Sequence, residues 1–473
     1  MKRLLLAAAL ALTLSGPALA AGFDRAAWQA DFVYLKTELE GSYSHLAWMA
    51  SPQSGIDLPA LNRRAERQLA KATSDAEAAD AIRAFVAGLH DGHLSELPTL
   101  KPAPPADPPA KRDLTRDDAR TGCAALGYAH RTSVAFSAPF EGLAGFRLLE
   151  GDQVFRAGLL PLPDGRTLGF VRIPRFRGAE FPELCQQAWA AILAKGETPS
   201  RGAIGDRMDD LFLQALAARL KSLEAAGAVA LVVDIGGNGG GNDLGDWAAR
   251  LFTDRPVKSA PLLMVDSPVS VGYFDEQIEG LKAAKPSPAV DAALKAFEAG
   301  KAVIGKQKAC SRNWVWREQR AWGADLDCAG LLSAGFASGA SQAIDPEPAL
   351  YWPIVAQPYA GAWTGPVYLL TNSGTASAAE MFAAVMRDNA IARTIGAKTS
   401  GLGCGFMGDG ETAVLPNSRL RFQIPNCVRL RGDGTDEVAG ISPDLPILPA
   451  EGESEAARAW RIVRTIAGDL SRG

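Results

Sequence analysis

The sequence predicts an α/β protein with a helical N-terminal domain and a small β-rich segment. Residues 228–235 read AVALVVDI, and such a short apolar run, placed after the amphipathic helix pattern of residues 210–226, is typical of a buried strand. A second strand pattern, at residues 366–371, leads through a turn into a helix pattern at residues 377–387. Apolar residues at helical spacing recur earlier, over residues 24–90.

The helical N-terminal domain is assigned to residues 21–101. Its helix patterns lie around residues 28–40, 58–71 and 75–89, which are rich in Ala, Leu, Glu and Lys. The sequence PAPPADPP at residues 102–109 then predicts an extended linker, because closely spaced prolines are incompatible with a continuing helix.

The remaining chain divides into a β-rich segment and a larger α/β domain. Short β-type runs predict the β-rich segment over residues 110–176, and the α/β domain follows over residues 177–450. Within it, residues 255–345 are interpreted either as a lid or substrate-facing insertion or as an ordinary packed excursion. Residues 412–424 predict a hairpin, and residues 451–473 a C-terminal helix.

The N-terminus resembles an export signal. Lys2 and Arg3 precede an apolar run at residues 4–14, and Ala18-Leu19-Ala20 has the small-x-small pattern of a signal-peptidase site. The apolar run is about eleven residues long, too short for a helix to span a bilayer core of ~30 Å. We therefore expect residues 1–20 to be a signal peptide cleaved near Ala20 and the mature chain to be periplasmic or secreted. The alternative is a hydrophobic N-terminal helix.

The composition is that of an ordinary folded protein. The 473 residues are 47% hydrophobic and 22% charged, and the net charge is −4. Because the charge is near zero and no basic run occurs, neither nucleic acid nor an anionic membrane surface is an expected partner. No later apolar stretch is long enough for a membrane anchor, and the oligomeric state is left open.

Six cysteines predict disulfides in an exported chain. Spacing favours Cys310–Cys328 and Cys404–Cys427, which leaves Cys123 with Cys185, although other pairings stay possible. None of the cysteines forms a C-x-x-C pattern, so a zinc site and thioredoxin-like chemistry are not expected.

Ser377 is a candidate nucleophile. It lies in the sequence NSGTASAAE, residues 372–380, where the predicted strand meets the predicted helix. One interpretation is a helix cap, because Glu380 follows three residues later, as in a capping box. The other is a hydroxyl exposed on a sharp turn, where the helix dipole and the Ala378 N–H would stabilise developing negative charge.

His93 is a candidate general base. It ends the sequence LHDGH, residues 89–93, at the end of a predicted helix. An imidazole with an ordinary pKa near 6.5 suits deprotonation of a serine at neutral pH. The alternatives are a solvated histidine at a helix terminus and a metal site with His90 and Asp91. Glu437 is interpreted either as a carboxylate that orients the base or as a solvated loop charge.

A glycine-rich turn follows the buried strand at residues 234–241, with the sequence DIGGNGGG. Successive glycines let the backbone approach a ligand and direct N–H groups at an anion, which is also what a tetrahedral oxyanion requires. The turn overlaps a degenerate dinucleotide fingerprint that lacks its third glycine, and Asp254 is the only nearby acid for a ribose. It contains no P-loop lysine.

Together and in this order, these segments resemble the C-terminal-processing (tail-specific) protease family, which includes the tricorn core protease. The resemblance covers roughly residues 25–450. It is carried by the sequences at residues 89–93, 169–176 (GFVRIPRF), 231–241, 372–380, 394–401 and 440–444.

Several positions depart from the family pattern. The lysine that many relatives use as a base is replaced by Leu402, and Lys398 lies four residues too early. The pattern is closer to the tricorn-type branch, but the serine that precedes its histidine is Gly92 here. Gly236 replaces the arginine of the glycine turn, and Ala379 replaces the second serine of the nucleophile turn. No PDZ module is evident.

The resemblance implies a ClpP/crotonase-like βαβ core and a serine peptidase without a metal or organic cofactor, which the N-terminal signal pattern predicts to be exported. Its substrate would be a peptide or protein, cleaved through an acyl-enzyme. The implied catalytic residues are Ser377, His93 and Glu437, with an oxyanion hole of Gly240, Gly241 and Ala378. The alternative is a catalytically inactive ligand- or peptide-binding protein on the same scaffold, as among the retinoid-binding relatives.

Overall fold

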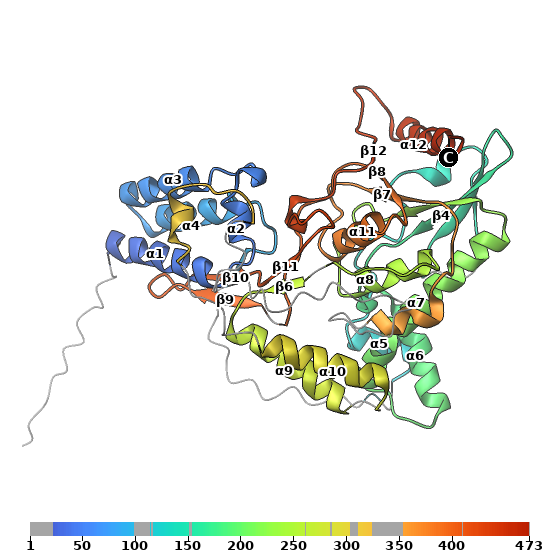
Figure 1. Ribbon diagram of the computed structural model, residues 1–473, viewed down its shortest axis with the longest axis horizontal. Coiled ribbons are helices and arrows are strands. Elements are labelled where there is room, and N and C mark those ends of the chain that lie inside the picture. The colour runs from blue at the N-terminus through green and yellow to red at the C-terminus, as the bar shows by residue number, and fades with distance from the viewer. Residues whose placement is uncertain are drawn as a thin grey trace, which may run out of the picture.

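The computed structural model describes residues 22–98, 114, 117–150, 154–260, 262–283, 286–302, 311–323, 353–408 and 410–472. Its first part is a group of helices, drawn in blue in Figure 1. They are α1 (Arg25–Ser42), α2 (Leu46–Met49), α3 (Leu58–Lys71) and α4 (Asp75–Ala87). Asp24, Asp57 and Ser74 cap α1, α3 and α4, since each side chain accepts a backbone N–H of the first turn.

The second part is built on a seven-stranded sheet with the strand order β12-β8-β7-β5-β4-β3-β2. The five strands from β12 to β4 run parallel, and β3 and β2 continue the sheet antiparallel. Their bounds are β2 (Arg147–Leu148), β3 (Ala157–Pro161), β4 (Thr167–Arg172), β5 (Ala230–Asp234), β7 (Val367–Thr371), β8 (Arg393–Gly396) and β12 (Leu445–Pro446). The expected α/β class is confirmed.

Helices cover both faces of this sheet. Leu231 and Val233 of β5 belong to a core shared with α6 (Pro182–Ala194), α7 (Arg201–Ala225) and α11 (Ala378–Asp388). Val232 points to the opposite face, where α12 (Glu455–Leu470) closes a second core. This alternation follows from the two-residue period of a strand and explains why β5 is apolar throughout.

The segment 110–176 is not separate from the α/β domain. Its strands β2, β3 and β4 belong to the main sheet, and β4 pairs in parallel with β5. The sequence suggested a division here because short β-type runs lie between the proline-rich linker and the helix pattern of residues 210–226. Register between distant strands is a tertiary property, which strand patterns alone do not reveal.

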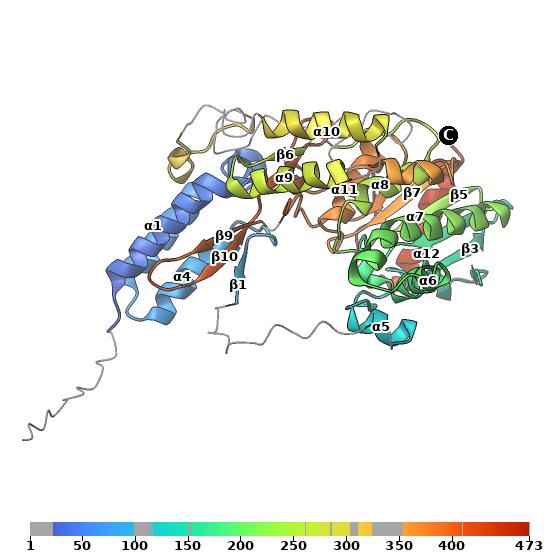
Figure 2. The same ribbon diagram turned by 90° about the horizontal axis from the view of Figure 1, so that it is seen from below.

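The hairpin expected at residues 412–424 is confirmed, and it packs on the N-terminal helices. Strand β9 (Glu411–Val414) pairs with β10 (Arg421–Ile424), which pairs in turn with β1 (Ser95–Leu97). Figure 2 shows this small sheet beside α1 and α4. The hairpin thus ties the C-terminal part of the chain to the helical domain.

The expected insertion at residues 255–345 is described only in part. Helices α9 (Pro268–Ala283) and α10 (Pro288–Lys301) lie side by side in both views. Trp314 and Trp316 are buried in the core of the N-terminal helices, so residues 311–323 are a packed excursion.

Two expected disulfides are confirmed. Cys123–Cys185 joins α5 (Ala119–Ala125) to α6, and Cys404–Cys427 joins the loop after β8 to β11 (Cys427–Arg429). The expected pair Cys310–Cys328 and the signal peptide lie outside the described residues. Over the part of the chain that is described, no helix combines the length and apolarity needed to cross a membrane.

Candidate active site

Ser377 occupies a turn that differs from the other serine caps of the protein. Its φ and ψ are 55° and −122°, in a region that non-glycine residues rarely adopt. Four other serines cap helices from extended backbone, and each accepts a hydrogen bond from the first turn: Ser74, Ser200, Ser287 and Ser454. Ser377 makes no such side-chain hydrogen bond. In the capping box that Ser377 and Glu380 form, the Ser377 N–H donates to Glu380 Oε2 at 2.9 Å.

The glycine turn packs directly against Ser377. A Cβ added to Gly240 would lie 2.7 Å from Ser377 Cβ and 2.8 Å from Ala378 N. Real Cβ atoms do not approach so closely, and Gly240 has a φ of 97°, so only glycine fits here. The turn and the start of α11 therefore form one surface around the hydroxyl.

The three N–H groups expected to form an oxyanion hole differ in their hydrogen bonds. The Gly240 N–H donates to Asn238 Oδ1 at 2.9 Å, so this amide is already occupied. Within the described residues, the N–H groups of Gly241 and Ala378 have no acceptor. Gly240 is thus corrected from a donor to a residue that permits close approach. The sequence alone does not reveal this hydrogen bond, because asparagine is a common residue in turns.

Glu380 connects Ser377 to the loop after β8. This fully buried carboxylate accepts hydrogen bonds at 2.6 Å from Thr399 Oγ1 and the Gly401 N–H, and at 2.9 Å from the Leu402 N–H. It also accepts the Ser377 N–H described above. The sequence predicted only a cap at this position. The structure adds a second role, which is to fix the loop that faces the histidine.

His93 is held on the other side of this loop. Its Nδ1 lies 3.0 Å from the Leu402 carbonyl oxygen, which can only accept, so Nδ1 carries the proton in the neutral ring. The ring lies against Gly405, where an added Cβ would be 2.7 to 2.9 Å from three ring atoms. Phe406 contacts the ring edge-on, with centroids 5.6 Å apart. This arrangement leaves Nε2 as the acceptor nitrogen.

The surroundings of His93 favour a neutral imidazole. Burial lowers the pKa of His93, although Asp91 and the Leu402 carbonyl act in the opposite direction. Asp91 Oδ1 accepts the His93 backbone N–H at 2.9 Å, and Asp91 Oδ2 accepts the Tyr43 hydroxyl at 2.9 Å. The side chain of His90 is exposed, so the three residues of the metal alternative face different surroundings.

Leu402 links the two candidates without closing a dyad. Its N–H binds Glu380, which holds the Ser377 N–H, and its carbonyl binds His93. No direct hydrogen bond between Ser377 and His93 occurs in the described structure. Catalytic hydrogen bonds are often long or poorly aligned until substrate binds.

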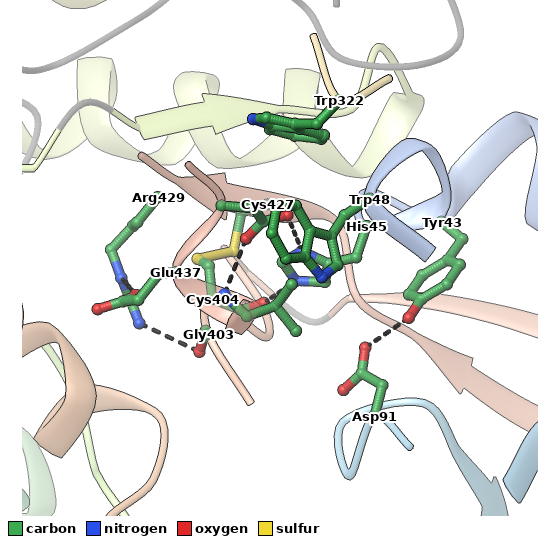
Figure 3. Close-up of polar contacts among 12 residues, drawn as sticks. Tyr43, His45, Trp48, Asp91, Trp322, Gly403, Cys404, Cys427, Arg429 and Glu437 are labelled. Carbon is green, nitrogen blue, oxygen red and sulfur yellow. Dashed lines mark hydrogen bonds and ion pairs between the residues drawn. A yellow bond between two sulfur atoms is a disulfide. The ribbon is translucent and has the colours of Figure 1, made fainter. Parts of the chain in front are cut away.

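Among the described residues, no hydrogen bond or ion pair joins Glu437 to His93. It is buried, and its Oε2 forms an ion pair at 2.5 Å with Arg429 Nε. Arg429 also donates to the Gly403 carbonyl at 3.2 Å, as Figure 3 shows. Burial raises the pKa of Glu437 to about 7, with Arg429 opposing this shift. The expectation that Glu437 orients the histidine is therefore corrected, because the Leu402 carbonyl occupies that place.

A second histidine, which no sequence motif indicated, lies in the same cluster. His45 is fully buried, with Nδ1 2.7 Å from Asp436 Oδ2 and Nε2 2.8 Å from the Cys404 carbonyl oxygen. Burial lowers its pKa, but Asp436, Asp91 and the Cys404 carbonyl together outweigh burial and raise the pKa to about 9. Figure 3 shows His45 beside the Cys404–Cys427 disulfide. His45, through the Cys404 carbonyl, and the disulfide therefore both hold the loop that carries Leu402.

Lys398, the other potential base, lies in a different environment. Its side chain is exposed and lines a cleft of 920 Å³ between the N-terminal helices and the loops near the C-terminus. Trp48, His90 and Arg431 also line this cleft, whereas Ser377 and His93 do not.

Comparison with known proteins agrees with this architecture. Residues 287–447 match the model of peptidase family S41, a span that includes Ser377 and Glu437 but not His93. The solved structure of mature CPAF is similar at 16% identity, with a TM-score of 0.55, covering 93% of this chain and 96% of that chain.

Mature CPAF complexed with lactacystin is similar at 15% identity, with a TM-score of 0.54, covering 94% of this chain and 98% of that chain. At these identities the likeness shows the fold alone. No curated protein matches the sequence. The expected resemblance is confirmed over residues 287–447, whose match to peptidase family S41 supports a serine-type peptidase, and the chain has a fold similar to that of mature CPAF.

Proposed function

We propose that the protein is an exported serine peptidase in which Ser377 is the nucleophile and His93 the general base. The observation that carries this proposal is the backbone conformation of Ser377. It differs from the extended conformation of the other serine caps, and it places Ser377 in contact with the glycine turn. A strained strand-to-helix turn is the way in which several hydrolase folds expose a serine hydroxyl. The neutral, oriented imidazole of His93 supports the second role.

The reaction follows from these positions. Glu380 holds the Ser377 turn and the loop of Leu402 together, and with substrate bound His93 Nε2 accepts the hydroxyl proton. Ser377 Oγ then attacks the scissile carbonyl, whose oxygen becomes an anion that accepts the Gly241 and Ala378 N–H groups. The protonated His93 gives its proton to the leaving amine as the C–N bond breaks.

Water completes the cycle. It gives a proton to His93 Nε2 and attacks the acyl-enzyme, and collapse of the second tetrahedral intermediate returns a proton to Ser377 Oγ. Glu437 acts at a distance in this scheme. Through Arg429 it holds the Gly403 carbonyl, and so it supports the loop that orients His93.

The test is the rate at which a fluorophosphonate labels the protein. We expect Ser377→Ala to abolish labelling and His93→Asn to slow it by roughly 10²–10⁴-fold, the usual contribution of a general base. Two neighbours serve as matched controls, since Ser373 and His90 are exposed residues of the same two turns. Ser373→Ala and His90→Asn should label at the wild-type rate, and equal losses in both pairs would contradict the proposal.

The second candidate function is ligand or peptide binding without catalysis. The absence of a hydrogen bond between Ser377 and His93 in the described residues favours it. Folded wild-type protein that never reacts with the probe would establish this alternative. Ser377 would then be a cap of unusual geometry.

Export is part of the proposal. Two disulfides are typical of oxidising compartments, which supports a location outside the cytoplasm. The mass of the N-terminal peptide of protein recovered from periplasm or culture medium tests it. A mature chain that begins at Ala21 is expected, and an intact Met1 on exported protein would contradict cleavage.

A further inference from the structure

Arg175 lies beside the candidate oxyanion hole. It follows β4, in a segment that runs along the glycine turn, where the Phe176 N–H donates to the Gly240 carbonyl at 3.0 Å. The Asn238 side chain donates to the Ile173 carbonyl at 3.0 Å on the other side of Arg175. The backbone on both sides of Arg175 is therefore fixed to the turn that packs against Ser377.

The guanidinium occupies a space that a missing side chain leaves open. A Cβ added to Gly239 would lie 2.4 Å from Arg175 Nη1. Gly239 directly precedes Gly240, whose own added Cβ would touch Ser377. Gly240 thus leaves room for Ser377, and Gly239 leaves room for Arg175. Both side chains therefore pack against the same short turn.

Arg175 has no partner among the described residues. No hydrogen bond or ion pair reaches its guanidinium, and its Nε is buried without an acceptor. Four other buried or partly buried arginines pair with carboxylates, namely Arg172 with Asp234, Arg250 with Asp246, Arg429 with Glu437 and Arg431 with Asp388, and the buried Arg219 and Arg312 donate to backbone carbonyls. The buried Nε of Arg172 also lacks an acceptor, yet Arg172 pairs with Asp234, so the feature particular to Arg175 is a guanidinium without any anion among the described residues, placed beside the candidate functional turn.

We propose that Arg175 determines specificity by binding a carboxylate of the substrate close to the scissile bond. This inference rests on the proposed peptidase function. A guanidinium presents a planar fork that matches both oxygens of a carboxylate, which fits it to this group better than a lysine would. The carboxylate belongs either to an Asp or Glu side chain of the substrate or to its C-terminus.

The test begins with peptides identified by mass spectrometry from a digested proteome treated with the wild-type enzyme. One cleaved sequence is then made in matched forms, with Glu or Gln at each position near the cut and with a free or amidated C-terminus. We expect one carboxylate form to be preferred. Arg175→Gln should reduce that preference, measured as a ratio of kcat/KM values, by about 10–100-fold.

Two further variants distinguish recognition from folding. Arg175→Lys keeps the charge without the fork and should restore part of the preference. Arg177→Gln removes the same charge from an exposed side chain two residues away and should leave the preference unchanged. The position of the effective carboxylate separates the two sources, since only a C-terminal group is sensitive to amidation.

Several outcomes would overturn the inference. It fails if the wild type does not distinguish the carboxylate and amide forms, or if Arg175→Gln lowers both rates equally. A wild-type protein that reacts with the fluorophosphonate and shows either result would refute the role of Arg175 and leave the peptidase intact. If the wild type does not react, the peptidase proposal fails. In that case, binding of peptides that differ only in a free or amidated C-terminus, or in Glu or Gln, is compared between the wild type and Arg175→Gln. This comparison tests carboxylate recognition alone.

Discussion

Replacing Gly405 by alanine tests the position of His93 without removing a reactive group. The new Cβ would lie 2.7 Å from His93 Cδ2 and 2.9 Å from Nε2, whereas ordinary contacts begin near 3.4 Å. The ring must therefore move by roughly 0.5–0.7 Å to reach ordinary contact, and its hydrogen bond to Leu402 would be strained. Misplacement by about 1 Å can cost ~10²-fold in rate, which corresponds to about 2.7 kcal/mol of activation free energy.

The assay for Gly405→Ala is the second-order rate of fluorophosphonate labelling, measured beside thermal unfolding. Gly280→Ala is a matched control, because nothing lies within 4 Å of the added Cβ in helix α9. We expect the control to label normally and Gly405→Ala to label about 10²-fold more slowly while remaining folded. Labelling of folded Gly405→Ala within about twofold of the wild type would refute the placement of His93 as the base.

Other expectations follow from the same cluster. The labelling rate should rise with pH with a midpoint below about 6.5, because burial lowers the pKa of His93 and only the neutral ring accepts a proton. The pKa of His45 is raised to about 9, so its ion pair with Asp436 stabilises the fold fully below about pH 6.5 and less as pH rises through 9. The free energy of unfolding, measured in urea, should therefore fall by roughly 3 kcal/mol between these pH values. Glu437→Gln should slow labelling by less than about tenfold, since Glu437 acts only through Arg429. Replacing Cys404 and Cys427 by serine should destabilise the fold by about 2–4 kcal/mol and also slow labelling, because this disulfide anchors the loop of Leu402.

Each of these expectations has a contradicting result. A pH midpoint above about 7 would mean that another group limits the rate. An unchanged pH dependence of unfolding in His45→Gln would exclude the buried pair as its source. A loss as large in Glu437→Gln as in His93→Asn would restore the direct role of Glu437. The double serine variant of Cys123 and Cys185 is the control for the disulfide, and an equal effect on labelling would show general destabilisation.

The sequence was sufficient for those features that are local. The buried run of β5 and the start of α11 at Ser377 follow from periodicity and turn chemistry. The hairpin of β9 and β10 likewise shows its two-residue alternation, and the pairing of Cys404 with Cys427 follows from spacing. Each of these depends on residues that are close along the chain.

The remaining features depend on contacts between distant segments. Glu380 resembles an ordinary capping residue until Leu402 and Gly401 fold onto it. Glu437 lies in a motif that implied a catalytic partner, yet Arg429 of the neighbouring strand binds it instead. The role of His45 depends on α2 reaching Asp436, nearly four hundred residues away. Tertiary packing determines which charged groups form pairs, and local sequence patterns do not predict these pairs.

The most direct test of the central claim is the site of the fluorophosphonate adduct, found by peptide mass spectrometry of the labelled wild-type protein. The account predicts a single adduct on Ser377, within the peptide that contains the turn against Gly240. An adduct on another serine, or folded protein that carries none, would contradict the assignment of Ser377 as the activated nucleophile.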